Sequence, residues 1–299
     1  MSRVYDDRVC ALGEGPLWHP IRQQFFWFDI VGKRLLTRTD AGPQEWQFDE
    51  NVSAAGWIDN DTLLMASETG LWRFSLIDGS CELVVSLEAD NPVTRSNDGR
   101  ADPWGGFWIG TMGKDAEAEA GAIYRFYKGE LRQLYQPITI SNAICFSPDG
   151  RFAYYTDTLT KLVMRQPLAA ADGWPEGTAE VYLDLRVEKL NPDGAVIDAT
   201  GNMWVAQWGA CRVAVYSSTG TFLKAVEFDA LQTSCPAFGG ADLTTLYCTT
   251  AAVGLKATTL EKAPEQWHDV SVDGRGPWPS RTSGDPVIPS LGVCYYPEH

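Results

Sequence analysis

The chain has 299 residues, and its 24 Lys and Arg against 39 Asp and Glu give a formal net charge of −15. A hydrophobic content of 44% excludes a disordered chain, since such chains are poor in these residues. The acidic balance argues against nucleic acid as a partner, because binding to phosphates depends on Lys and Arg. We therefore expect a globular protein with a large core.

The N-terminal segment and the cysteines favour a cytoplasmic protein. Residues 1–8 show no apolar stretch behind a basic start, and no run approaches the ~18 apolar residues of a membrane helix. Seven cysteines are scattered without a Cys-x-x-Cys pair, which fits neither a disulfide framework nor a zinc ribbon. We predict a cytoplasmic location and no membrane partner.

Six short hairpins recur along the chain, each with a strand, a turn of Asp, Pro or Gly, and a second strand headed by an aromatic residue or Leu. Their second strands contain, in chain order, Trp27, Leu64, Trp108, Tyr154, Trp204 and Tyr247. The spacing of about 40 to 50 residues is typical of the four-stranded blades of a β-propeller.

We predict an all-β fold, a six-bladed β-propeller with a metal site in its central channel. No stretch has a long helical period, which disfavours α/β architectures, and a pair of β-sandwiches would not explain six similar hairpins. Residues 1–275 are expected to form this single domain. Residues 276–299 are rich in proline and are expected to form an irregular C-terminal arm. A closed propeller is expected to be a monomer.

Residues at one repeat phase of the innermost strands should converge on one mouth of the channel. Counting back 11 to 13 residues from the six repeat positions gives Glu14, Ser53, Asn97, Asn142, Asp193 and Pro236. Two carboxylates and two amides among them describe a site for a hard divalent cation such as Ca²⁺, Mg²⁺ or Mn²⁺. Zn²⁺ and Fe²⁺ remain open as alternatives, because the site would be accessible to water.

Each of these residues also has a simpler structural interpretation. Asn142, Asp193 and Asp98 each precede a small residue, and Asn and Asp in that context are common turn formers. Glu14 stands between two glycines and could be a solvated turn carboxylate. The shared repeat phase favours a common site over separate turns.

Five segments, taken in order, resemble the signature segments of the regucalcin, gluconolactonase and luciferin-regenerating enzyme family. They are Leu12–Trp18, Arg95–Gly99, Ile140–Asn142, Pro192–Gly194 and Phe238–Gly240, and the match extends over about residues 10–255. The resemblance implies a six-bladed propeller of sugar lactonases with one divalent metal in the channel. It implies Glu14, Asn142 and Asp193 as the metal ligands, with Asp193 also acting as the acid/base residue.

The resemblance also implies which residues face the substrate. Arg95 and Asn97 are expected there, although Arg95 could instead form an ion pair at the channel mouth with Asp98 or another acidic residue. A further substrate-facing Glu is expected before the strand that starts at Gly121, where either Glu117 or Glu119 could serve, or neither if this is a solvated acidic loop. After Leu255 the chain departs from the family pattern, which leaves the closure of the last blade open.

The function that follows is metal-dependent hydrolysis of a sugar lactone, an aldonolactone, to the sugar acid in carbohydrate metabolism. The metal would polarise the carbonyl and acidify a water, and Asp193 would move the proton. The chain lacks Gly-x-Ser-x-Gly and His-Glu-x-x-His motifs, which disfavours a serine esterase or a metalloprotease. The alternatives are a phosphotriesterase-like or arylesterase-like propeller hydrolase, and a calcium-binding or scaffold propeller without turnover.

Overall fold

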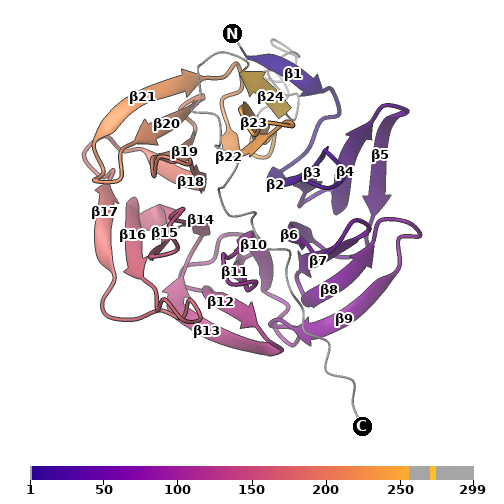
Figure 1. Ribbon diagram of the computed structural model, residues 1–299, viewed down its shortest axis with the longest axis horizontal. Coiled ribbons are helices and arrows are strands. Elements are labelled where there is room, and N and C mark those ends of the chain that lie inside the picture. The colour runs from indigo at the N-terminus through magenta and orange to yellow at the C-terminus, as the bar shows by residue number, and fades with distance from the viewer. Residues whose placement is uncertain (1, 256–269, 274–299) are drawn as a thin grey trace.

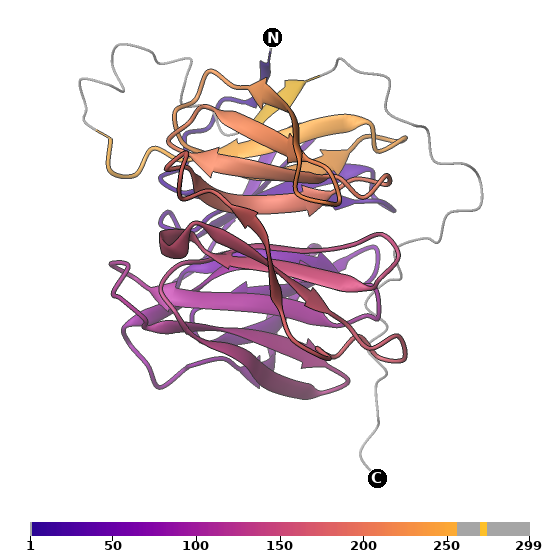
Figure 2. The same cartoon turned by 90° about the vertical axis from the view of Figure 1, so that its left-hand side faces the viewer.

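A computed structural model describes residues 2–255 and 270–273 of the chain. Within these residues every regular element is a strand except one 3₁₀ turn, η1 (Thr158–Thr160). The strands form sheets around a central axis (Figure 1), and the side view shows the same sheets edge-on (Figure 2). The expected all-β propeller architecture is confirmed. The described residues contain no helix with the length and apolar character needed to cross a membrane.

Five sheets are complete blades, each made of four antiparallel strands that follow one another in the chain. The first strand of each blade is the innermost one (Figure 1). The first two blades contain β2 (Gly13–His19), β3 (Gln24–Asp29), β4 (Arg34–Thr39) and β5 (Gly42–Gln47), then β6 (Val52–Trp57), β7 (Thr62–Ser67), β8 (Gly70–Ser75) and β9 (Cys81–Ser86).

The other three complete blades have the same arrangement. Their strands are β10 (Thr94–Ala101), β11 (Phe107–Gly113), β12 (Gly121–Tyr127) and β13 (Glu130–Ile138); β14 (Ser141–Phe146), β15 (Phe152–Asp157), β16 (Leu162–Pro167) and β17 (Glu180–Asp184); and β18 (Asn191–Ile197), β19 (Met203–Trp208), β20 (Arg212–Tyr216) and β21 (Phe222–Glu227).

The remaining four-stranded sheet is composite. It places β22 (Thr233–Gly239) and β23 (Thr245–Thr250) beside β24 (Val270–Asp273), and its outermost strand is β1 (Arg3–Asp6) from the other end of the chain. The prediction of a six-bladed propeller is therefore wrong: five blades are built from consecutive strands, and a sheet shared by distant segments closes the ring. The expected arm at 276–299 lies outside the described residues.

The strong apolar character of the second strands follows from their position between neighbouring sheets. All six residues of β3 are buried, whereas the outer strands β9 and β21 are mostly exposed. The rings of Trp108 and Phe146 meet edge-to-face at 5.5 Å between one pair of sheets, and those of Trp204 and Phe238 do so at 5.5 Å between another. Burial of such large rings is the main stabilising contribution here.

The turns between the first and second strands contain the Asp residues of the repeat. Asp102 Oδ1 accepts hydrogen bonds from the backbone N–H groups of Trp104 (2.9 Å) and Gly106 (2.8 Å). Asp198 Oδ1 does the same for Thr200 and Asn202, both at 2.9 Å. These Asp side chains therefore stabilise turns, which lie at the ends of the sheets opposite to the candidate site.

Candidate functional site

Each of the six innermost strands has a register shift of the β-bulge type near its start. The shifts lie between Glu14 and Leu17, Val52 and Ala54, Ser96 and Gly99, Asn142 and Cys145, Pro192 and Ala195, and Thr233 and Pro236. A bulge bends its strand and re-aims side chains. The repeat phase found in the sequence therefore marks a belt of bulges at one mouth of the channel. In β22 the residues within the shift are Ser234 and Cys235, so Pro236 lies just after it.

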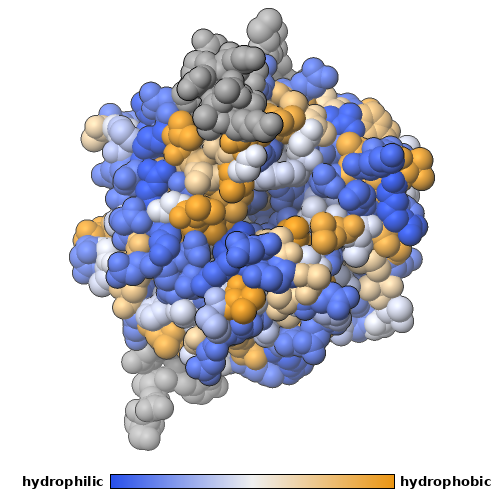
Figure 3. All heavy atoms as spheres, turned by 180° about the vertical axis from the view of Figure 1, so that it is seen from behind, coloured by the Kyte–Doolittle hydropathy of each residue, from blue (hydrophilic) through white to orange (hydrophobic). Residues whose placement is uncertain are grey.

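The mouth with the bulges is on the rear side of the molecule as drawn in Figure 1. The turn η1 follows β15 at this mouth, and it is the short coil on the left-hand side of Figure 2, the side that corresponds to the rear of Figure 1. Figure 3 therefore looks onto this mouth and shows a recess close to the centre of the face, surrounded by hydrophilic and hydrophobic residues in separate groups.

Glu14 of β2 and Asp193 of β18 bring two carboxylates into this belt, and each residue is only 4% exposed. Burial raises the pKa of both groups, and the charges of nearby carboxylates, including Asp98, raise them further. The backbone N–H of Gly15 donates to Glu14 Oε2 at 3.1 Å. Among the ion pairs of the described residues, none includes either carboxylate. A bound cation would favour the ionised form of both carboxylates, so this pair is a candidate cation site.

The buried amides of Asn97 and Asn142 connect three blades at the same mouth. Asn97 Nδ2 donates to the carbonyl of Ser141 (2.8 Å) and to Asn142 Oδ1 (3.2 Å). Asn142 Nδ2 donates to Thr158 Oγ1 (3.0 Å), whose hydroxyl donates to the carbonyl of Pro192 (2.8 Å). The network therefore fixes the orientation of both amides and connects them to β18, the strand that contains Asp193.

Arg95 lies next to this network and is 6% exposed. Its Nη1 donates to Asn97 Oδ1 (2.7 Å) and to the carbonyl of Ser96 (2.9 Å). Burial lowers the pKa of Arg95 to about 10, and the negative charges of Glu14 and Glu68 oppose that shift. The ion pairs of the described residues include none between Arg95 and Asp98, and the guanidinium donates to Asn97 and to the Ser96 carbonyl instead.

The two loop candidates, Glu117 and Glu119, lie between β11 and β12. Gly113 pairs with Thr94, so the loop leaves its sheet at the mouth with the bulges. Both residues are exposed. Glu117 Oε2 accepts a hydrogen bond from the backbone N–H of Asp115 (3.0 Å) within its own loop, and the N–H of Glu119 donates to Thr139 Oγ1 (3.1 Å). The loop is at the mouth, but its carboxylates lie outside the buried belt.

Two further residues of the mouth, Thr158 and Arg100, did not follow from the sequence, and Asp98 was suggested only as a turn former or as an ion-pair partner of Arg95. Thr158 joins Asn142 to β18, as described above. Asp98 Oδ2 accepts from the backbone N–H of Ile144 (2.7 Å), and Arg100 Nε donates to the Ile144 carbonyl (3.0 Å). The sequence signal for the last two was their place in or beside the segment Arg95–Gly99, which holds three predicted or suspected site residues.

The metal site that was expected as part of the fold needs a correction. Within residues 2–255 and 270–273, no three side chains of His, Cys, Asp or Glu form a group that could hold a metal ion. The expected ligand set contains only two residues of these types, Glu14 and Asp193, together with the amide of Asn142. All three are brought to the same mouth by their bulges.

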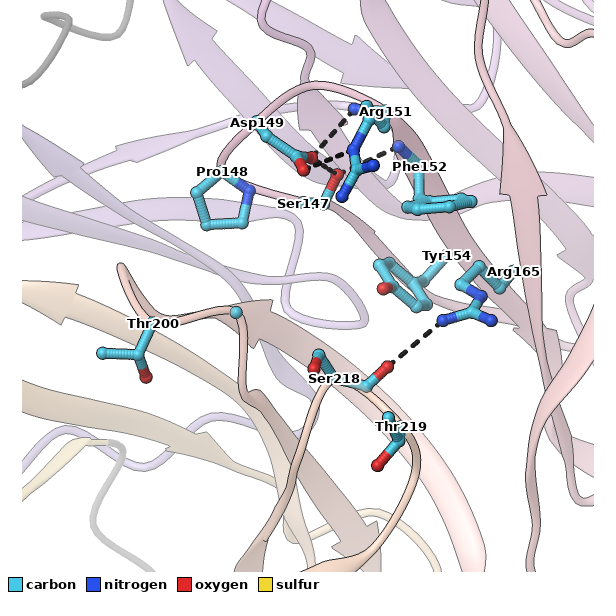
Figure 4. A pocket seen from close by; sticks show the side chains of 11 residues that line it. Ser147, Pro148, Asp149, Arg151, Phe152, Tyr154, Arg165, Thr200, Ser218 and Thr219 are labelled. Atoms are coloured by element: carbon cyan, nitrogen blue, oxygen red, sulfur yellow. Dashed lines mark hydrogen bonds and ion pairs between the residues drawn. The ribbon is translucent and has the colours of Figure 1, made fainter.

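A separate cavity of about 390 Å³ lies between two blades at the opposite ends of the strands, lined in part by Phe152, Tyr154, Ser218 and Thr219 (Figure 4). Its two arginines are already paired: Arg165 with Glu180 at 2.5 Å and Arg151 with Asp149 at 2.6 Å. The cavity contains no unpaired buried carboxylate. We therefore place the candidate site at the mouth with the bulges.

Comparisons with known proteins point to one family. Residues 12–252 match the family model described as SMP-30/Gluconolactonase/LRE-like region. A 6-deoxy-6-sulfogluconolactonase of Pseudomonas putida is 33% identical, with 85% of this chain and 88% of the relative covered, and an L-arabinolactonase of Azospirillum brasilense is 33% identical, with 85% of each covered. Among solved structures, a regucalcin of Agrobacterium tumefaciens, described as a calcium-binding protein, is similar with a TM-score of 0.89 and 38% identity, covering 92% of this chain and 93% of that chain.

Proposed function

Since the chain belongs to the SMP-30/gluconolactonase/LRE-like family, we propose that it is a lactonase that hydrolyses a sugar lactone to the sugar acid. The similar proteins named for lactonase activity support this reaction class. The observation that carries the proposal is the pair of buried carboxylates, Glu14 and Asp193, beside the Arg95 and Asn97 network at one mouth of the channel.

We further propose that one divalent metal ion is held by Glu14, Asn142 and Asp193. These side chains offer oxygen donors, and two buried carboxylates balance a charge of +2, which suits a hard cation. The similarity to a regucalcin described as calcium-binding makes Ca²⁺ our first choice, with Mg²⁺, Mn²⁺, Zn²⁺ and Fe²⁺ as alternatives. When bound, such an ion polarises a lactone carbonyl and makes a water more acidic.

In this proposal Asp193 is the acid/base residue. Its carboxylate takes a proton from the attacking water as the oxygen of that water bonds to the carbonyl carbon. As the bond from that carbon to the ring oxygen breaks, Asp193 returns the proton to the ring oxygen, which becomes the hydroxyl of the sugar acid. Asp and Glu carboxylates are common general acids and bases in enzymes.

Arg95 and Asn97 would bind and orient the lactone. The guanidinium of Arg95 is a rigid fork of donors for ring hydroxyls, and the Asn97 amide can both donate and accept. The hydrogen bond between them, at 2.7 Å, fixes one relative to the other before substrate arrives. Such preorganisation reduces the ordering that binding requires.

Glu117 and Glu119 are proposed as alternative substrate contacts from the loop. We expect that one of Glu117→Gln and Glu119→Gln raises KM for the lactone while kcat stays near that of the wild type, because an exposed loop residue contributes binding more than chemistry. Steady-state kinetics of both variants would identify the residue. Wild-type KM in both variants would mean that this is a solvated acidic loop.

The central test is proton release at fixed pH from D-glucono-, D-xylono-, L-arabinono- and D-galactonolactone by metal-stripped protein, before and after each divalent ion is added. Asp193→Asn keeps the shape of the side chain and should lower kcat by about 10² to 10⁴-fold, as loss of an acid/base residue does. The matched control is Asp184→Asn at an exposed ion pair with Arg186, which should keep wild-type turnover. Full turnover by Asp193→Asn would contradict the proposal.

The same experiment, with paraoxon added to the panel of substrates, separates the other candidate functions. Metal binding without turnover of any lactone would favour a calcium-binding or scaffold propeller, which the description of the similar regucalcin supports. Preference for paraoxon over the lactones would favour a phosphotriesterase-like or arylesterase-like hydrolase. The cytoplasmic location and the monomeric state remain predictions.

A further inference from the structure

Asp98 and Arg100 of β10 hold a backbone segment of the neighbouring blade from both sides. Asp98 Oδ2 accepts from the N–H of Ile144 at 2.7 Å, and Arg100 Nε donates to the carbonyl of the same residue at 3.0 Å. Ile144 lies within the register shift between Asn142 and Cys145, outside the paired positions of β14 and β15. Its buried N–H and C=O need partners, and β10 supplies both.

Arg100 also reaches a third blade. Its Nη2 donates to the carbonyl of Ala195 in β18 at 3.1 Å, at the end of the register shift that contains Asp193. The innermost strands present one edge to the channel, so a side chain from β10 can reach backbone carbonyls of both β14 and β18. The guanidinium of Arg100 thus connects the two bulges that contain Asn142 and Asp193.

The bulge of β14 has a conformation that needs such support. Ala143 stands between Asn142 and Ile144 and has a φ of +56°, in the left-handed region that non-glycine residues seldom adopt. Conformations of this kind persist only where the surroundings hold them. In this conformation the Asn142 amide contacts Asn97 and Thr158 at the mouth.

We propose that Asp98 and Arg100 are positioning residues: by clamping the Ile144 peptide they hold Ala143 in its left-handed conformation, and so direct the Asn142 amide to the metal. This inference rests on the proposed function, since it assigns Asn142 its place at the metal. Neither residue needs to touch the substrate or the metal for this role.

A purely electrostatic role makes a different prediction. Asp98 is close enough to influence the charges of Glu14 and Asp193, so removal of its charge alone could change metal binding. Asp98→Asn removes the charge but keeps an oxygen that can accept from the Ile144 N–H. Asp98→Ala removes both the charge and the oxygen that accepts from the Ile144 N–H. The two variants therefore separate the clamp from the charge.

The test measures binding of Ca²⁺ alone by calorimetry, and hydrogen exchange of the Ile144 amide, in the full-length chain. We expect Asp98→Ala to lower Ca²⁺ affinity by about 10 to 100-fold, as loss of an outer-shell partner does, and to speed exchange at Ile144. Asp98→Asn should recover most of the Ca²⁺ affinity and most of the protection of the Ile144 amide from exchange. Arg100→Lys keeps the positive charge, but a lysine cannot donate to the carbonyls of both Ile144 and Ala195 as the guanidinium does. The Ca²⁺ affinity of this variant should therefore fall as well. If Asp98→Ala does not fold, Arg100→Lys provides the test in its place.

Asp102→Ala is the matched control. This carboxylate of the same blade also holds two backbone amides, at the far end of the sheet, so its loss should lower Tm while Ca²⁺ affinity stays at the wild-type value. Asp98→Ala with the Ca²⁺ affinity and the Ile144 exchange rate of the wild type would overturn the clamp. So would an Asp98→Asn variant that binds Ca²⁺ as weakly as Asp98→Ala does. A wild-type protein that binds no divalent ion would contradict the proposed function and not the clamp. In that case the exchange of the Ile144 amide still tests the clamp, because an unchanged rate in Asp98→Ala would overturn it.

Discussion

Gly15 is the residue on which the placement of Glu14 most directly depends. It has a φ of +54°, and a Cβ at this position would clash with the carbonyl oxygen of Ser53 in the next blade. Glycine is therefore required both by the backbone conformation and by the close approach of two strands. The same contact brings β2 and β6 together beside the candidate site.

Gly15→Ala should lower the free energy of unfolding by about 1 to 3 kcal/mol, since the new methyl group adds a clash to the strain at positive φ. It should also weaken Ca²⁺ binding, because Glu14 is the preceding residue. Gly129→Ala is the control. Gly129 has a φ of +82° but open space around its Cβ position. This variant should therefore lose free energy of unfolding through backbone strain while its Ca²⁺ affinity stays at the wild-type value. Urea unfolding and calorimetry measure both effects, and equal Ca²⁺ affinity in the two variants would refute the expectation.

The sequence predicts part of the site residue by residue. Counting from the repeat positions identifies Glu14, Asn97, Asn142 and Asp193, all of which are buried at the mouth. Asp98 is harder to predict, because neighbouring residues of a regular strand point to opposite faces. The shift between Ser96 and Gly99 breaks this alternation, and both Asn97 and Asp98 then reach β14. The spacing locates the repeat phase, but it does not show that a bulge directs two consecutive side chains toward β14.

At the level of elements, the closing strand β1 depends on its last residue. Asp6 is 1% exposed, and its carboxylate accepts hydrogen bonds from Arg8 Nε (2.8 Å) and Arg38 Nη1 (3.1 Å). Burial opposes ionisation of Asp6, but the hydrogen bonds from Arg8 and Arg38 outweigh it, so the pKa of Asp6 lies below its ordinary value. The charged carboxylate thus joins β1 to β4.

Asp6→Asn should lower the free energy of unfolding at pH 7 by about 1.5 to 3 kcal/mol, the range for hydrogen bonds to a charged group. Because the pKa is lower in the folded state than the ~3.9 of an unfolded chain, the wild type keeps this stabilisation above about pH 4 and loses it as the pH falls through the folded value. The difference between the two proteins should therefore shrink from pH 5 to pH 2. A constant difference across that range, in urea unfolding, would disprove the role of the charge.

The sequence reveals the five consecutive blades better than the composite sheet. Within a blade, strands and Asp turns follow one another closely, so a local repeat is visible. In contrast, β1 and β24 have four residues each, and their pairing joins Arg3 to Val272. No local pattern can report a partner so distant along the chain, which is why the closure could not be predicted.

For the whole molecule, hydrogen bonds join neighbouring sheets around the mouth. Ser234 Oγ donates to the Gly13 carbonyl (2.5 Å), Ser53 Oγ to Ser96 Oγ (2.8 Å), and Asn97 and Thr158 continue the series to β18. A ligand bound to Glu14, Asn142 and Asp193 would therefore connect three blades of one continuous ring. Its binding energy should stabilise the fold as a unit.

We expect Ca²⁺ at 100 times its Kd to add about 2.7 kcal/mol to the free energy of unfolding, provided that the unfolded chain does not bind it. Scanning calorimetry should show a single transition that moves to higher Tm with Ca²⁺ and returns with a chelator. The double variant Glu14→Gln, Asp193→Asn should show no such shift. A Tm rise of the same size in that variant would place the ion elsewhere on the molecule.

The composite sheet also sets the order in which the protein can be completed during synthesis. Residues 3–6 leave the ribosome before the strands of the five consecutive blades, but their partner strand at 270–273 emerges only after all of those blades. Until then β1 has no strand beside it, and the edge of β23 that later pairs with β24 is equally open, so the nascent chain carries two edges that could pair with other chains. Release of the last strand is thus the event that turns a row of blades into a closed ring.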